Sequence, residues 1–190
     1  HKSYSELKAL REVKANQINK FIDQQKDETK VLADTVQKVQ NQAFSKLITV
    51  QQLKEAQIKD FFSKVRKDIS ILAERGDIKQ AFSTLMQYRR ELGLGSEERF
   101  LVNTPEYEQL WKECSTYLNR YVENLGYYDV FLISSTGGQV MYSYARESDL
   151  GANLSSGKYK EQGLARLWQK VVQKEKTVLE DYSAYSPSQG

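Results

Sequence analysis

The residue types that most often carry out catalysis are nearly absent from this sequence. The only histidine is His1, and the only cysteine is Cys114, which lies in a stretch with helical periodicity and has no internal histidine to activate its thiol. The run Ser-Ser-Thr-Gly-Gly at 134–138 has no lysine after its glycines, so we interpret it as a hairpin turn rather than a phosphate-binding loop. There is also no thiolate zinc cluster and no Gly-x-Ser-x-Gly motif, so we expect no enzymatic activity, no metal and no cofactor.

The charges are distributed evenly along the chain. The sequence contains 28 Lys and Arg residues and 25 Asp and Glu residues, for a formal net charge of +3. Its lysines alternate with acidic residues and glutamines, as they do on solvated helix faces, whereas a nucleic-acid surface needs a basic stripe or stacking aromatic side chains. We therefore expect no nucleic-acid partner.

The first 75 residues contain neither glycine nor proline, which predicts unusually long helices. Part of this stretch is repeated: the nine residues that begin at Val13 resemble the nine that begin at Leu53. The region is therefore either one continuous helix or a hairpin, with any turn placed in residues 41–52. Apolar residues at helical spacing form a stripe that needs another helix to cover it. The stripe includes Leu7, Leu10, Val13, Ile18, Phe21, Ile22, Val31, Leu32, Val36 and Val39.

Two shorter helices are predicted next. Gly76 and Asp77 mark the boundary before a helix at 78–92, and Thr104-Pro105 begins another that ends near Gly126. Apolar residues recur along the second helix at three- and four-residue spacing, and we expect the aromatic ones among them to pack in the core. They are Tyr107, Trp111, Tyr117 and Tyr121.

After Gly126 the pattern changes to short strands. A β-prone run at 127–133, a glycine-containing turn and a second run at 139–145 predict a hairpin, followed by a helix at 159–174 and a third strand at 177–182. This predicts an α+β fold, in which a long antiparallel helical bundle precedes a partial antiparallel sheet with one packed helix. Because such a sheet leaves an apolar edge exposed, we expect the complete domain to continue with at least two more strands.

Four motifs follow one another in residues 126–190. They are Tyr-Asp-Val-Phe-Leu-Ile at 128–133, Val-Met-Tyr-Ser at 140–143, Arg-Glu-Ser-Asp-Leu-Gly-Ala-Asn-Leu at 146–154 and Leu-Glu-Asp-Tyr at 179–182. In this order they resemble the Cache-type, PAS-like sensor domains of methyl-accepting chemotaxis proteins and related histidine kinases. The helices upstream are similar to the membrane-emergent stalk of these receptors. The family's domain continues into two further strands that complete its sheet, and this sequence lacks them.

The resemblance implies a chemotaxis transducer that binds a small molecule and signals by helix displacement. Residues 1–126 would form its helical stalk and residues 127–190 a partial sensor domain, in the periplasm or outside the cell. The protein would be a homodimer through its long helices, fixed in the bacterial inner membrane. No apolar run in the sequence approaches the length of about 18 residues needed to cross a bilayer, so we expect the membrane anchors to lie outside it.

A pocket is also implied, with a few polar groups in an aromatic wall. The candidate residues are Tyr142, Tyr144, Arg146, Asp149, Lys158, Tyr159, Asp181 and Tyr182. Arg146 or Lys158 would bind a ligand carboxylate and Asp181 an ammonium group, which suits an amino acid or an organic acid. Each residue also has a structural interpretation: the tyrosines as sheet-face packing, Asp149 as a turn residue, and Arg146 as half of a surface ion pair.

Two other functions fit the same features. The chain could be the sensor domain of a histidine kinase or a cyclase receptor, because these share the extracytoplasmic region. It could also be a helical scaffold or tether, because the unbroken first 75 residues are the kind of element that joins other proteins.

Overall fold

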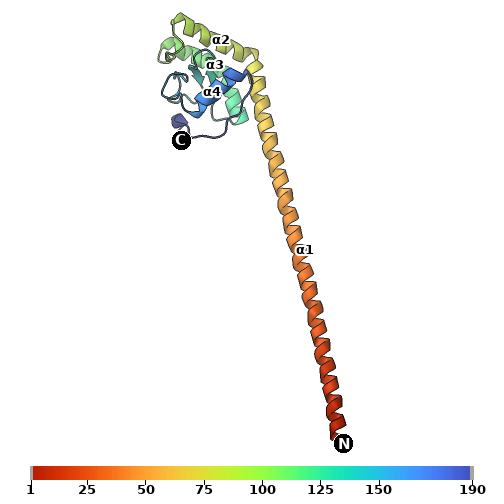
Figure 1. The fold of residues 1–190 in the computed structure, drawn as a ribbon. Coiled ribbons are helices and arrows are strands. Elements are labelled where there is room, and N and C mark those ends of the chain that lie inside the picture. Colours follow the sequence, from red (N-terminus) through yellow and green to blue (C-terminus); the bar gives the residue numbers. More distant parts are fainter. Residues whose placement is uncertain (1, 189–190) are drawn as a thin grey trace. The chain divides into compact units, whose positions relative to one another are not determined.

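The computed structural model describes residues 2–188 and divides the chain into two units, His1–Phe61 and Phe62–Gly190. The described residues of the first unit, 2–61, are all helical, and the second unit contains the remaining elements. The predicted α+β class is confirmed: a long helix is combined with shorter helices and a small partial sheet (Figure 1). The predicted domain boundary at residue 126 stays a prediction.

Helix α1 extends without interruption over Lys2–Glu74. Of the two alternatives for the repeat, the structure has the continuous helix, and residues 41–52 contain no turn. Residues 3–61 are exposed throughout, so the apolar stripe is uncovered in the first unit. Phe21, for example, is 63% exposed and Val36 is 49% exposed. Removal of these apolar side chains from water by a partner would be favourable, because it lowers the free energy of the helix.

Two helices follow in the second unit, α2 at Gly76–Glu91 and α3 at Pro105–Leu125. Only Arg75 separates α1 from α2, close to the predicted boundary at Gly76 and Asp77. The predicted start of α3 is confirmed, because the Thr104 hydroxyl accepts a hydrogen bond from the backbone N–H of Tyr107 at 3.1 Å. Gly126 ends α3 with a φ of 71°, a conformation that glycine adopts without a Cβ penalty.

The predicted hairpin is present as β1, Phe131–Ile133, paired antiparallel with β2, Val140–Ser143. The free side of β2 is partly covered by the loop that follows it. The backbone N–H of Val140 donates to the carbonyl of Ala152, and the N–H of Gly151 donates to the carbonyl of Val140, both at 2.9 Å. The predicted third strand is wrong: residues 177–182 form no strand. The backbone of these residues pairs with no strand in the described part of the chain, and a β-strand requires backbone hydrogen bonds to a neighbouring strand.

The sheet lies between two apolar clusters. On one face, Leu132 and Tyr142 pack with Tyr107 and Leu118 of α3 in a cluster that also includes Leu72 of α1. The second cluster lies against helix α4 at Gly163–Lys174 and consists of Val140, Ala152, Leu154, Tyr159 and Ala165, with Phe131, Ile133, Leu164 and Trp168 packed around them. Helix α4 thus starts four residues later than predicted, and a short 3-10 helix follows at Ser186–Ser188.

Candidate functional site

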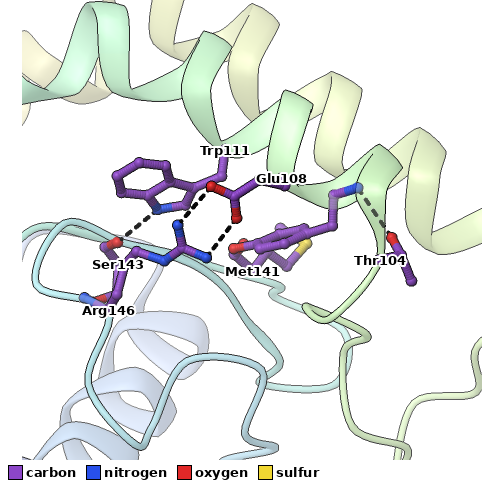
Figure 2. A network of polar contacts seen from close by, with 7 residues as sticks. Thr104, Glu108, Trp111, Met141, Ser143 and Arg146 are labelled. Carbon is purple, nitrogen blue, oxygen red and sulfur yellow. Dashed lines mark hydrogen bonds and ion pairs between the residues drawn. The ribbon is translucent and has the colours of Figure 1, made fainter.

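Arg146 stacks on Trp111 and pairs with Glu108 (Figure 2). Its guanidinium carbon lies 4.4 Å from the ring centroid, and its two terminal nitrogens donate to the two Glu108 oxygens at 3.0 and 2.7 Å. The hydrogen bond from Arg146 lowers the pKa of Glu108. This is the surface ion pair of the structural interpretation, and a ligand carboxylate would have to displace Glu108 to reach Arg146.

Tyr142 is fully buried beside this pair and stacks on Trp111 with ring centroids 5.9 Å apart. Its hydroxyl lies 3.1 Å from the Ser115 hydroxyl and donates to Asn119 at 3.3 Å. Burial raises its pKa to about 12. Tyr142 therefore packs under α3 and stays neutral at physiological pH.

Asp129 fixes the backbone that carries Tyr144 and Arg146. Its Oδ1 accepts hydrogen bonds from the backbone N–H groups of Val130, Tyr144 and Ala145, at 2.6, 2.7 and 3.2 Å. Its Oδ2 accepts the Ser143 hydroxyl at 2.7 Å. Desolvation by burial raises the pKa of Asp129, and these donors act in the opposite direction. The sequence did not reveal this role, because three of the donors lie more than ten residues away in the chain.

Asp149 and Tyr159 both lie beside Tyr185, in the segment after α4. Asp149 is fully buried, and its Oδ2 accepts the Tyr185 hydroxyl at 2.6 Å. Its Oδ1 has no hydrogen-bond partner among the described residues. Tyr159 is also buried, and its hydroxyl lies 2.7 Å from that of Ser148. Burial raises the pKa of Asp149, since the charged form loses its hydration.

The other three predicted residues are exposed. Lys158 is exposed, with its ammonium nitrogen 4.5 Å from the ring centroid of Tyr159. Asp181 is exposed and accepts the backbone N–H of Tyr182 at 2.8 Å, and Tyr182 is 87% exposed. The eight predicted residues are thus separated into several places rather than gathered around one cavity. Ligand binding by them stays a prediction.

A cleft of about 540 Å³ lies elsewhere in the second unit. Its walls come from the last turns of α1, the end of α3, the start of the hairpin, α4 and the residues after α4. The lining side chains are Val65, Asp68, Ile69, Leu72, Ala73, Tyr121, Val122, Leu125, Tyr127, Asp129, Val130, Leu167, Val171, Glu175, Lys176, Thr177, Val178 and Leu179. None of the eight predicted residues is among them. Sequence periodicity identified Tyr121 only as a core residue, because it does not show where two helices leave space between them.

Two amides hold the loop before α3 against the sheet. The side-chain nitrogen of Gln139 donates to the carbonyls of Gly95 and Glu98, at 2.8 and 3.1 Å, and its oxygen accepts from Arg89 at 2.8 Å. Asn153 donates to the carbonyls of Ser96 and Glu98. Both amides are buried and fully used in these contacts, so their role is to position loops.

No family model, curated protein or solved structure matches this chain. Among residues 2–188, no helix combines the length and the apolar character needed to cross a membrane. In the same residues, no group of three or more His, Cys, Asp or Glu side chains is placed to hold a metal ion. Cys114 is buried in the core, and burial raises the pKa of its thiol to about 11, so the reactive thiolate is scarce at neutral pH.

Proposed function

We propose that this chain is the ligand-sensing extracytoplasmic region of a bacterial transmembrane chemoreceptor. One observation supports it best: the cleft of about 540 Å³ is lined by Val65, Ile69, Leu72 and Ala73, which all belong to α1. A molecule bound there contacts the same helix that is continuous back to Lys2. Ligand binding can therefore be read out as a displacement of α1.

The signal needs two arrangements of α1 that differ in their affinity for the ligand. A ligand shifts such an equilibrium only by its differential affinity for the two states. Packed helices change by small translations or rotations between discrete arrangements, which suits transmission along a long helix. In this proposal the receptor is a homodimer, and the exposed stripe of α1 packs against the same stripe of a second copy.

Two other functions share part of this support. A histidine kinase or cyclase receptor uses the same extracytoplasmic device and differs only in its output domain. A helical scaffold or tether accounts for the exposed stripe of α1, but it gives no role to the cleft. The sensor proposal accounts for both features.

The test is a thermal-shift screen of this chain against amino acids, organic acids and amines. We expect at least one of these compounds to raise the melting temperature with saturable concentration dependence, because a ligand that binds only the folded state stabilises it. A spin label at Lys30, on the face of α1 opposite the stripe, would then report a ligand-dependent change in the distance between two copies. Stabilisation by none of the compounds contradicts the sensor and favours the scaffold.

A further inference from the structure

The charged groups that line the cleft of about 540 Å³ are mostly acidic. The lining contains three carboxylates, those of Asp68, Asp129 and Glu175, and one ammonium group, that of Lys176. Such an excess of negative charge favours a cationic ligand over an anionic one. The charge balance therefore differs from the carboxylate-binding site that the sequence predicted at Arg146 and Lys158.

The three carboxylates are not equally available. Asp129 already accepts four hydrogen bonds, three from backbone N–H groups and one from the Ser143 hydroxyl. Glu175 is exposed to solvent at the end of α4. Asp68 is half-buried, and one of its oxygens accepts the Tyr127 hydroxyl at 3.2 Å. Asp68 is thus the carboxylate best placed to accept a ligand ammonium group.

Most of the other lining side chains are aliphatic. Ile69 and Leu72 come from α1, Val122 and Leu125 from α3, and further aliphatic side chains from α4 and residues 178–179. Its volume lies in the range of about 300–1,000 Å³ that is usual for small-molecule sites. Such walls favour a ligand with a compact apolar body, because burial of that body removes apolar surface from water.

We propose that this cleft binds an amine, a molecule with an apolar body and a single ammonium group. The ammonium group pairs with Asp68, and the body lies among the side chains of α1, α3 and α4. The role of the amine as a signal rests on the proposed sensing function, but binding of the amine to the cleft can be measured independently of it. It names both the site and the chemical class of the ligand.

The test compares 2-phenylethylamine with 2-phenylethanol and with phenylalanine by isothermal titration calorimetry on the whole chain. The alcohol has the same body without the charge, and the amino acid adds a carboxylate that the acidic lining disfavours. We expect the amine to bind about fivefold more tightly than the alcohol. This ratio corresponds to about 1 kcal/mol, which is the usual contribution of a partly exposed ion pair. We expect phenylalanine to bind less tightly than the amine.

Two pairs of variants locate the site. Asp68→Asn should remove the preference for the amine over the alcohol, whereas Asp60→Asn, at an exposed position of the same helix, should retain it. Val171→Trp should block all three compounds, since Val171 lines the cleft, whereas Val172→Trp should not. The two valines suit the comparison because they are 38% and 39% exposed. Circular dichroism confirms that each variant is folded before binding is measured.

Equal binding of the amine and the alcohol overturns the inference, as does amine binding that survives both Asp68→Asn and Val171→Trp. A compound from the wider screen that stabilises the chain without the cleft variants affecting it would overturn this inference and leave the sensor proposal standing. Failure of every compound in both experiments contradicts both proposals.

Discussion

At the scale of single residues, the number of hydrogen-bond donors distinguishes the half-buried carboxylate of Asp129 from the buried carboxylate of Asp149. Asp129 accepts four hydrogen bonds from protein groups, whereas Asp149 accepts one, from Tyr185, and its other oxygen has none among the described residues. Burial raises the pKa of both. The donors stabilise the ionised form of Asp129, so this side chain organises backbone, whereas Asp149 carries a desolvation penalty that is only partly offset.

Asp129→Ala should lower the free energy of unfolding by about 3 kcal/mol, because it leaves the N–H groups of Val130 and Ala145 without an acceptor and Tyr144 with only the longer bond to the Val130 carbonyl. Asp129→Asn should cost less than half as much, since the amide oxygen can still accept all three bonds. Urea denaturation measures both values, with Asp181→Ala as the exposed control. Equal losses for Ala and Asn would show that these hydrogen bonds do not stabilise the fold.

Asp149 should make the stability of the chain depend on pH in one direction. Its folded pKa lies above that of the unfolded chain, which is about 3.9. Its contribution is therefore fully present below the unfolded pKa and is lost as pH rises through the folded pKa. Relative to Asp149→Asn, the natural protein should lose stability as the pH rises from about 4 towards neutral. Urea denaturation of both proteins across this range tests the sign, and a constant or opposite difference contradicts the assignment.

At the scale of elements, the loop after β2 takes the place of a third strand at that edge of the sheet. It pairs with Val140 through backbone hydrogen bonds and is crossed closely by the chain before α3. At Gly151, with a φ of 76°, a Cβ atom would lie 2.7 Å from the carbonyl oxygen of Phe100. Only glycine fits both the conformation and the space, so this position fixes the approach of the two loops.

Gly151→Ala should therefore destabilise the protein by more than about 2 kcal/mol, which combines about 1 kcal/mol for the left-handed backbone with the steric conflict. Gly93→Ala is the matched control, because Gly93 has a φ of 67° and an added Cβ would meet nothing within 4 Å. It should cost only about 1 kcal/mol. Thermal unfolding of both variants gives the comparison, and equal costs would mean that the contact with Phe100 relaxes freely.

At the scale of the whole molecule, the exposed stripe of α1 is the feature that most needs a partner. Within residues 3–61 every side chain is exposed, including large aliphatic and aromatic ones at helical spacing. A helix with such a stripe is stabilised chiefly by packing rather than by its intrinsic propensity. The proposed homodimer supplies this packing.

Val36→Glu should weaken the dimer by about tenfold or more, because it places a charge in the apolar interface at a cost of a few kcal/mol. Lys30→Glu is the control, because in a helix of 3.6 residues per turn Lys30 lies on the face opposite the centre of the stripe. Sedimentation equilibrium of the three proteins measures the dissociation constants. A chain that is monomeric at all concentrations, or equal effects of the two variants, contradicts dimerisation through this stripe.

The sequence by itself determined the α+β class, the helix boundaries near Gly76 and Thr104 and the hairpin, because helix periodicity, the cap at Thr104 and the glycine turn at 134–138 are local signals. The tertiary structure decided the rest. It alone showed that residues 177–182 form no strand, that Arg146 is held by Glu108, and that a cleft lies between α1, α3 and α4. The physical reason is that strand pairing, ion pairing and cavities depend on groups that are far apart in the chain. A local pattern of residues does not show which of these groups come together in the fold.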